Sequence, residues 1–551
     1  MLLNSNVIFP TVLFLGLFAM AARDAADPDL WWHLKTGQLI VESKTVPHTD
    51  PFSFTRAGEP WIAHEWLSDV LLYEIQRTAG WAGLIITFAA VITGAFLLLY
   101  LRCGSNPFVA GVAALCAAFA TRPLWGVRPQ MLSLLLASLW LLILDRSERN
   151  PKLLYWTLPL TLLWVNLHAG FALGLALSGL FLVGRWIEGA TGADQNASGL
   201  SFPAFILALD LLLVPFNPNG FKLFWYPIET LRSAAMQNYI AEWASPNFHR
   251  AEYAPFLLIV LATFAVLGSA RTSLRARDLL LLVVALFAAL RSIRLIPLFA
   301  LIAVPIISRQ VAVWLNQRTA KPLQRGAPSA AFRMRLNAAI VASMAAFAVL
   351  HIVQVIRDQP QAEAQNFPVR AVAFLQAHPS AGPIFNHYDW GGYLIWKLFP
   401  STRVFIDGRA DVYGGNFLRD FAQTYQLKDD WQHLLERWEI QTVLVPRNSA
   451  LATGLREAPG WRVTYEDAQA IILTAPSKGA ALLPISPTPK WLLQSPMHDS
   501  YSRYARNYTC QSLLRVIMGA NISPAALYEY MGHKSRRAEG LYLLGKAVWN
   551  V

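Results

Sequence analysis

The sequence has few cysteines and few charged residues for its length. Three cysteines (Cys103, Cys116 and Cys510) are spread over 551 residues and form no CxxC pair. This spacing excludes a disulfide-stapled secreted domain and a zinc site built on paired cysteines. Charged residues make up 15% of the chain, where about a quarter is usual for a soluble protein. Because disordered chains are rich in charge and poor in apolar residues, disorder is also excluded as the dominant state.

Short motifs that mark several enzyme classes are missing as well. The chain contains no GxGxxG, no P-loop and no GxSxG sequence. Nothing therefore indicates a nucleotide-dependent enzyme or a serine hydrolase of the nucleophile-elbow type.

Long apolar runs are the main feature that the sequence does have. Apolar residues make up 55% of the chain, and the mean hydropathy is +0.37. A helix needs about 20 mostly apolar residues to cross a bilayer. The sequence therefore predicts an α-helical polytopic membrane protein with its membrane domain in residues 1–356. We expect about eleven spans, at residues 5–22, 81–101, 107–121, 129–144, 153–168, 170–187, 201–216, 253–270, 278–290, 295–315 and 337–356. No basic residue precedes the first run, so we expect a retained helix rather than a cleaved signal peptide.

The charges predict how these spans are oriented. The net charge is +12, which in a soluble protein would suggest nucleic acid. Here twelve basic residues fall in alternate short loops, whereas the long first loop (residues 23–80) is rich in acids. By the positive-inside rule, the N-terminus is cytoplasmic, and the first loop and everything after about residue 357 lie outside. The basic excess is then explained without a nucleic-acid partner. These are the twelve basic residues: Arg102, Arg146, Arg149, Lys152, Arg271, Arg275, Arg277, Arg318, Lys321, Arg325, Arg333 and Arg335.

The composition changes after the last span. Residues 366–476 contain short β-branched or aromatic runs (GPIFNHY, TRVFID, QTVLVP and QAIILTA) between helix-like segments. This alternation predicts a small extracytoplasmic α/β domain with a three-layer arrangement. Residues 477–498 are rich in proline and serine and are expected to form a linker. Residues 499–551 are expected to form a helical tail, for which the sequence indicates no role.

Two carboxylates follow the first span in the segment DAADPDLWWHLKTG. Asp27 and Asp29 flank a proline at the outer headgroup level. Aspartate is a good helix N-cap, so Asp29 could simply cap a helix that starts near Leu30. That role leaves Asp27 and the adjoining Trp31 and Trp32 unexplained. A carboxylate held at this depth could instead deprotonate a hydroxyl or bind a divalent cation.

Other polar residues gather at the same outer face. The segment WIAHEWLSDVLLYEI has helical spacing and predicts an amphipathic helix on the membrane surface. Its His64 and Glu65 could be a solvated pair at a helix start, or could add ligands or proton carriers to the acids. Arg291 and Arg294 stand three residues apart, which predicts one helix face suited to a phosphate or diphosphate, although headgroup anchoring is an alternative. We expect substrate-binding residues among His33, His64, Glu65, Arg128, Asn166, His168, Glu242, Arg291 and Arg294.

A further candidate lies in the expected outer domain, in the segment RVFIDGRADVY. Asp407, Arg409 and Asp411 fall at the end of an expected strand, where loops often carry binding residues. Because Asp-Gly is a strong turn pair, Asp407 could instead begin a turn that Arg409 fixes by an ion pair. In the functional interpretation this loop faces the membrane and meets the acceptor or the sugar of the donor.

Several of these segments together resemble a bacterial family of multispanning proteins. They are DPDLWWHLKTG, WIAHEWL, WVNLHAG, PFNPNG, EWASP and YDWGGYLIWKLFPSTRVFIDGRADVYG. That family in turn resembles the GT-C superfamily of membrane glycosyltransferases, and the likeness runs from about residue 5 to about residue 475.

The resemblance implies a function and a location. It implies a GT-C-like fold in the bacterial cytoplasmic membrane, a polyprenyl-phosphate-type sugar donor, and membrane lipids as partners. It also implies an acid in the first outer loop that acts as base or helps to bind a metal. Asp27 and Asp29 occupy that position, and either could be the base. The sugar and the acceptor stay open.

A non-catalytic transporter or a scaffold for envelope glycan assembly is the alternative. A transporter would place polar residues at mid-membrane on broken helices. Here the polar residues concentrate at the outer ends of the spans, which favours an enzyme.

Overall fold

The computed structural model describes residues 5–104, 106–192, 199–269, 274–318, 329–380, 382–428 and 430–475. All of them belong to Met1–Ser495, one of the two units into which the chain divides. The expected linker (477–498) and helical tail (499–551) lie outside the described residues.

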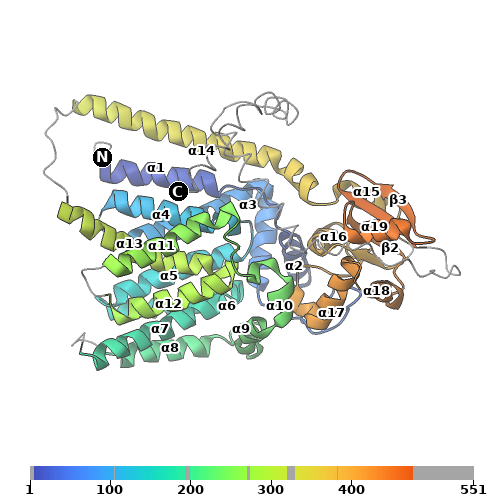
Figure 1. Cartoon of the computed structure of the whole chain (residues 1–551), viewed down its shortest axis with the longest axis horizontal. Coiled ribbons are helices and arrows are strands. Elements are labelled where there is room, and N and C mark those ends of the chain that lie inside the picture. The colour runs from blue at the N-terminus through green and yellow to red at the C-terminus, as the bar shows by residue number, and fades with distance from the viewer. Residues whose placement is uncertain are drawn as a thin grey trace, which may run out of the picture. The chain divides into compact units, whose positions relative to one another are not determined.

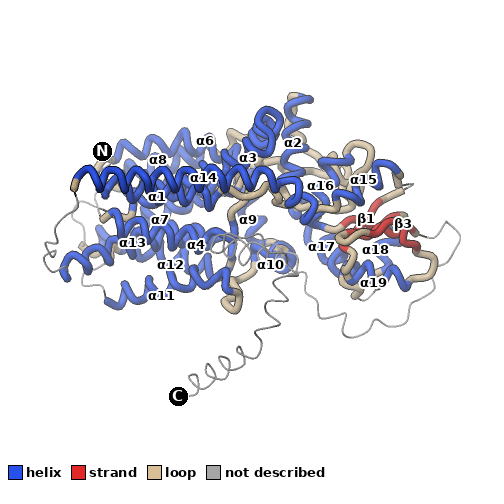
Figure 2. Tube along the Cα trace, turned by 90° about the horizontal axis from the view of Figure 1, so that it is seen from above, coloured by secondary structure: helices blue, strands red, loops and turns tan. Residues whose placement is uncertain are grey.

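Each of the eleven expected apolar segments coincides with a helix (Figures 1 and 2). Among the described residues, seven helices are long and apolar enough to cross a membrane, so the number of spans stays a prediction. The eleven helices are α1 (Ser5–Ala21), α3 (Trp66–Arg102), α4 (Pro107–Thr121), α5 (Gln130–Ser147), α6 (Thr157–Leu167), α7 (Phe171–Ala190), α8 (Ser201–Leu213), α11 (Ala254–Ser269), α12 (Ala276–Arg291), α13 (Ile296–Arg318) and α14 (Ala330–Asn366).

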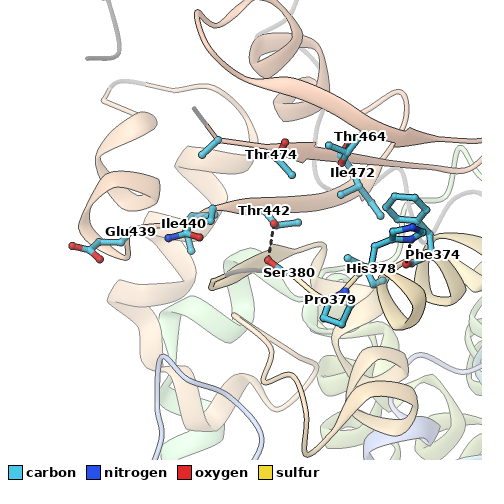
Figure 3. Close-up of a pocket in the computed structure, with 13 residues that line it drawn as sticks. Phe374, His378, Pro379, Ser380, Glu439, Ile440, Thr442, Thr464, Ile472 and Thr474 are labelled. Atoms are coloured by element: carbon cyan, nitrogen blue, oxygen red, sulfur yellow. Dashed lines mark hydrogen bonds between the residues drawn. The ribbon is translucent and has the colours of Figure 1, made fainter. Parts of the chain in front are cut away.

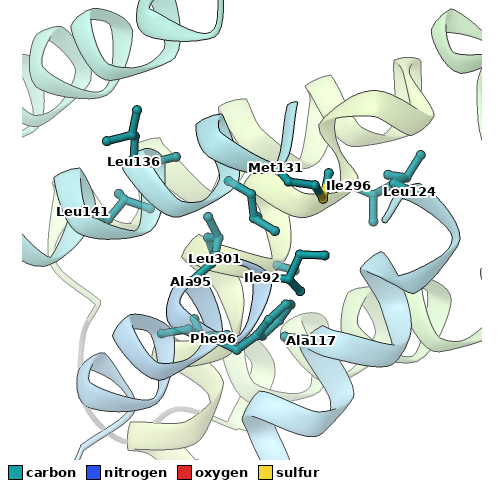
Figure 4. Packing of buried hydrophobic residues seen from close by; sticks show 14 of the residues in the cluster. Ile92, Ala95, Phe96, Ala117, Leu124, Met131, Leu136, Leu141, Ile296 and Leu301 are labelled. Carbon is teal, nitrogen blue, oxygen red and sulfur yellow. The ribbon is translucent and has the colours of Figure 1, made fainter. Parts of the chain in front are cut away.

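Close packing between these helices forms the core. Helix α3 contacts α5, and α4 contacts α13 and α11. Figure 4 shows Ile92 and Phe96 of α3, Ala117 of α4, Met131 of α5 and Leu301 of α13 in one buried cluster. Small residues along α4 let neighbouring backbones approach, as in many membrane helix pairs. Helix α14 instead exposes large apolar side chains such as Leu350, which suits contact with lipid.

The first loop contributes a helix that supports the acids. Helix α2 (Leu30–Ser43) packs along the start of α3. A Cβ on Gly37 would lie 2.1 Å from the Asp69 carbonyl oxygen, so only glycine permits this approach. The expected surface helix and the second span form one helix, α3, with a break at Gly80. Two short helices, α9 (Lys222–Arg232) and α10 (Ala234–Tyr239), precede α11.

A small mixed sheet forms the centre of the C-terminal domain. Its strand order is β1-β2-β4-β3, with β1 parallel to β2 and the other pairs antiparallel. Figure 2 shows the strands between α15 on one side and α18 and α19 on the other. The elements are α15 (Val369–Ala377), β1 (Ile384–Asn386), α16 (Gly391–Leu398), α17 (Ala410–Tyr425), α18 (Gln432–Arg437), β2 (Thr442–Pro446), α19 (Ala450–Glu457), β3 (Arg462–Glu466) and β4 (Ala470–Thr474).

The segment TRVFID was expected to form a strand, but it forms no regular strand in the structure. Val404 makes only isolated parallel bridges, one to Ile384 of β1 and one to Ser53 of the first loop. The Val404 N–H donates to Phe52 O at 3.1 Å, and the Phe54 N–H donates to Val404 O at 3.1 Å. The first loop thus extends the sheet of the C-terminal domain. A sequence cannot show this pairing, because the partners are about 350 residues apart.

A buried ion cluster fixes this junction. Arg409 Nη2 lies 2.7 Å from Asp50 Oδ1 and 2.7 Å from Asp407 Oδ2. The guanidinium also lies over the rings of Phe52 and Trp61, at 4.9 and 4.6 Å from the ring centroids. The first loop and the C-terminal domain are therefore held together by charge, ring contacts and backbone pairing.

Replacing Asp50 should weaken this junction strongly. Asp50→Ala leaves Arg409 buried with one partner fewer, and removing one member of a buried ion pair costs roughly 3–5 kcal/mol. We expect a clearly lower thermal midpoint in detergent, measured by intrinsic fluorescence. The control is Asp420→Ala, whose pair with Arg419 is exposed and is worth at most about 1 kcal/mol. Equal midpoints for the two variants would contradict the proposed importance of the junction.

Candidate functional site

The two acids of the first loop have different surroundings. Asp27 is buried, and its Oδ2 lies 3.4 Å from Arg128 Nη1, just before α5. Its Oδ1 accepts the Asp29 N–H at 3.0 Å. Burial raises the pKa of Asp27, while the Arg128 guanidinium acts in the opposite direction. Asp27 therefore binds two neighbours, the Arg128 guanidinium and the backbone N–H of Asp29.

Asp29 precedes α2 as the sequence predicts, but its side chain bonds a partner other than the helix backbone. It stands at the N-cap position of α2, but its side chain makes no capping hydrogen bond. Instead its Oδ1 accepts the indole N–H of Trp32 at 3.1 Å. In the described part of the chain no donor reaches Oδ2 and no cation lies within ion-pair distance. Burial, and then the charge of Asp27, raise the pKa of Asp29 to about 7. A carboxyl with this pKa can exchange a proton near neutral pH.

Glu242 joins two arginines beside the acids. Its Oε1 lies 2.5 Å from Arg128 Nη1, and its Oε2 lies 3.6 Å from Arg294 Nε. The Arg294 guanidinium also lies 5.5 Å from the Trp243 ring centroid. Glu242 is buried, whereas the Arg294 side chain is 31% exposed. The arrangement holds two guanidinium groups on one carboxylate.

The expected pairing of Arg291 with Arg294 is wrong. Helix α12 ends at Arg291, and Ser292 is extended. Arg294 lies in the following 3-10 turn, Ile293–Leu295. Arg291 is exposed and donates to Gln237 Oε1 at 3.0 Å. The two residues therefore do not share a helix face, and only Arg294 joins the acids.

Glu65 lies among three histidines. Its Oε1 is 3.3 Å from His64 Nε2 and 3.2 Å from His168 Nε2, and its Oε2 is 3.5 Å from His33 Nε2. Burial opposes ionisation, yet the imidazoles of His64 and His168 hold the pKa of Glu65 well below its usual value. His33 also bonds Asp69 at 2.5 Å. The expected pair of His64 and Glu65 is thus part of a larger buried network.

The hydrogen bonds of His168 fix its tautomer. The Gly170 N–H donates to His168 Nδ1 at 2.8 Å, so Nδ1 is an acceptor, and Ser133 Oγ lies 2.8 Å from the same atom. The ring is therefore neutral and carries its hydrogen on Nε2, which faces Glu65.

Asn166, Asp407 and Arg409 bond residues other than Asp27 and Asp29, whereas Gly408 of the DGRAD segment lies against Asp29. Asn166 Oδ1 accepts the Trp66 indole N–H at 2.8 Å, and its amide donates to the backbone carbonyls of Leu162 and Phe216. Asn166 therefore links three separate segments of the chain. Asp407 and Arg409 lie inside the junction described above. Asp411 is exposed at the start of α17. Burial, and then Asp411, raise the pKa of Tyr226 well above its usual value.

Five residues that contact the site were not among the expected site residues. Trp32, Asp69 and Ser133 bond site residues directly, as shown above. Tyr388 donates its hydroxyl to Gly408 O at 3.2 Å, and Gly408 lies against Asp29. The only sequence signal for Tyr388 and Gly408 was their place in the YDWGG and DGRAD segments. None of the five has a spacing that would reveal its partner.

A resident metal does not fit these donors. Within the described ranges no group of three or more His, Cys, Asp or Glu side chains is arranged to hold a metal ion. Asp27 already forms an ion pair with Arg128, and Glu242 forms ion pairs with Arg128 and Arg294. The acids are therefore better suited to proton transfer and ion pairing than to coordination.

A separate hollow lies in the C-terminal domain (Figure 3). A cavity of about 650 Å³ is lined by Phe374, His378, Ser380, Glu439, Thr464 and other residues of that domain. Ser380 and Thr442 hydrogen bond each other across its wall at 2.7 Å. No expected site residue lines it. Its polar groups are neutral hydroxyls for the most part, so the chemistry of the acids is elsewhere.

Replacing Glu65 should destabilise the protein in a defined pH window. Glu65→Gln removes the charge that three histidines face, and hydrogen bonds to a charged group are worth roughly 2 kcal/mol. The pKa of Glu65 is lowered, so its contribution is present above pH 4.5 and lost as the pH falls. The pKa of His64 is raised by Glu65, against the effect of burial, so its contribution is present below pH 6.5 and lost as the pH rises.

The stability difference between wild type and Glu65→Gln should therefore be largest between pH 4.5 and 6.5. Thermal midpoints measured from below pH 4.5 to above pH 6.5 test it, with the exposed Glu59→Gln of the same loop as control. A difference that does not vary with pH would mean that the histidines do not carry charge in the network.

Comparisons with known proteins concern the fold. No family of known sequences matches the chain, and no curated protein matches it. Among solved structures, it is similar to the archaeal oligosaccharyltransferase AglB from Archaeoglobus fulgidus, with a TM-score of 0.49 and 11% identity over 80% of this chain and 69% of that one.

Two further solved structures are similar. ArnT from Cupriavidus metallidurans, bound to undecaprenyl phosphate, gives a TM-score of 0.47 and 12% identity over 85% of this chain and 97% of that one. Arabinofuranosyltransferase AftD from Mycobacteria gives 0.48 and 13% over 86% of this chain and 40% of that one. The chain thus resembles these three structures over 80–86% of its length at 11–13% identity.

Proposed function

We propose that the protein is a membrane glycosyltransferase that moves a sugar from a polyprenyl-phosphate-type donor to an acceptor at the outer face of the bacterial cytoplasmic membrane. One observation carries this proposal. Asp29, with a pKa raised to about 7 and one oxygen that no donor in the described residues reaches, lies beside Asp27 and the arginines that Glu242 joins. A base and a phosphate-binding cation pair are the two groups that such a transfer needs.

Asp29 acts as the general base. The acceptor hydroxyl attacks the anomeric carbon of the donor sugar and gives its proton to Asp29 Oδ2. The new carbon–oxygen bond forms as the bond between the sugar and the lipid phosphate breaks. A pKa near the working pH is the best compromise between being deprotonated and accepting a proton. Asp27 supports this role because its charge helps to raise the pKa of Asp29.

Arg128 and Arg294 suit the leaving phosphate. Negative charge grows on the phosphate as the sugar leaves, and positioned guanidinium groups stabilise it. Arg294 is the more accessible of the two. Glu242 holds both arginines before the substrate arrives, so little reorganisation is needed when the charge develops.

The depth of the site agrees with a lipid-borne donor. Asp27 and Asp29 follow α1 directly and precede α2, at the end of the first expected span. A polyprenyl-linked sugar stays at the headgroup plane, because its lipid does not leave the bilayer. The twelve basic residues of the alternate loops favour the outer face for this end of the helices.

Removing the carboxylate of Asp29 should abolish most of the transfer. General bases contribute about 10²–10⁴-fold, so Asp29→Asn should lower kcat by about that factor with an unchanged thermal midpoint. Asp27→Asn should lower it less, because it removes a neighbour of the base. For the wild type, kcat/KM should rise with pH to a plateau, with half of the rise near pH 7.

The measurement is transfer from a labelled polyprenyl-phosphate sugar by purified protein. Glu42→Gln, at the exposed far end of α2, is the control and should keep wild-type kinetics. Full activity of Asp29→Asn would place the base elsewhere.

The sidedness of the site is tested by cysteine labelling. In a background without Cys116 and Cys510, Gly415→Cys should react with a membrane-impermeant maleimide in intact spheroplasts, because residue 415 is exposed in the C-terminal domain. Arg149→Cys, exposed in an expected cytoplasmic loop, should react only after lysis. The reverse pattern would overturn the outer-face location.

A further inference from the structure

Gly408 of the C-terminal domain lies directly against the carboxylate of Asp29. A Cβ at this position would be 1.8 Å from Asp29 Oδ1 and 3.4 Å from Trp32 Nε1. The same Oδ1 accepts the Trp32 indole hydrogen. One oxygen of Asp29 is thus enclosed by an indole and a bare Cα, while Oδ2 takes no donor in the described part of the chain.

The peptide of Gly408 is itself held from several directions. Tyr388 donates its hydroxyl to Gly408 O at 3.2 Å, and the Ala410 N–H donates to the same oxygen at 2.9 Å. On one side Asp407 accepts the Arg409 N–H at 3.0 Å and the Tyr413 hydroxyl at 2.6 Å. On the other side Arg409 bonds Asp50 of the first loop. The position of Gly408 relative to α2 is therefore fixed by the buried ion cluster.

We propose that Gly408 is a positioning residue, which sets Oδ1 of Asp29 against Trp32 and leaves Oδ2 directed to the acceptor hydroxyl. Tyr388 and Arg409 act through it. This inference rests on the proposed function for its catalytic meaning, but the placement of the carboxylate can be measured without any transfer reaction. It gives the C-terminal domain a part in catalysis that does not require contact between its side chains and the substrate.

The chemistry explains why a glycine is needed here. The neighbour that a Cβ would strike is the end of a movable carboxylate, not a backbone atom. Gly408→Ala can therefore fold with the Asp29 side chain rotated away. That rotation breaks the Trp32 bond and takes the carboxylate out of its buried place. Because burial is the largest cause of the raised pKa, the pKa of the displaced group should fall.

The test uses full-length protein in detergent and two measurements. A hydrophobic carbodiimide modifies protonated carboxyl groups, and mass spectrometry quantifies the modified Asp29 peptide against pH. In wild type the midpoint of labelling should lie near pH 7, and in Gly408→Ala it should fall by about one pH unit. In the transfer assay kcat should fall roughly 100-fold with an unchanged KM for the donor, as for a misplaced reacting group.

Two further variants separate positioning from packing. Gly454→Ala also introduces a Cβ into a tight place of the same domain, 2.8 Å from Leu427 side-chain carbons, and should leave both the labelling midpoint and kcat unchanged. Tyr388→Phe loosens Gly408 without adding bulk and should lower kcat about fivefold, the effect of one hydrogen bond, with a thermal midpoint lowered only by the loss of that bond. It also keeps the test informative if Gly408→Ala does not fold.

The outcomes are distinct. An unchanged labelling midpoint in Gly408→Ala, or an equal shift in Gly454→Ala, overturns the inference. A loss of kcat without a shift in labelling also overturns it, because Asp29 would then not have moved. A shifted midpoint in a protein whose wild type transfers no sugar from any polyprenyl-phosphate donor supports the placement of Asp29 by Gly408 and instead refutes the proposed function.

Discussion

The buried guanidinium of Arg409 is the interaction on which the site depends. It lies between Asp50 of the first loop and Asp407 of the C-terminal domain, and both carboxylate contacts are 2.7 Å long. Burying three charged groups is costly unless each has a partner, so this cluster tolerates little displacement. Gly408 stands between Asp407 and Arg409. The cluster therefore sets the distance between the C-terminal domain and Asp29 at the same time as it joins the two parts.

The other charged residues near the two acids form ion-paired groups. Glu242 forms ion pairs with both Arg128 and Arg294, and Glu65 is surrounded by histidines. Asp29 differs, since it has a neighbouring acid and an indole but no cation within ion-pair distance in the described residues. Opposite charges would lower its pKa, whereas burial beside a like charge raises it. Asp29 can therefore exchange a proton, whereas Glu242 and Glu65 stabilise the structure through their ion pairs.

Much of the fold could be predicted because it depends on local composition. Apolar length predicted eleven segments that each coincide with a helix, and β-branched runs predicted β1, β2 and β4. Partners far apart in the chain could not be predicted. Arg128 meets Glu242 across 114 residues, and the spacing of Arg291 and Arg294 suggested a shared helix face that the end of α12 removes. Charge counting predicts that the acids lie at the outer face, whereas the different surroundings of Asp27 and Asp29 are visible only in the tertiary contacts.

Asp407–Gly408 shows why a correct local prediction can still miss a role. The sequence predicts a turn at Asp-Gly, and glycine is common in turns because of its free backbone. In the structure the demand on Gly408 comes instead from Asp29, some 380 residues earlier, whose Oδ1 occupies the place of a Cβ. Both demands select the same residue, so the residue type alone cannot distinguish them. A substitution that a turn tolerates and a carboxylate does not, such as alanine, separates the two.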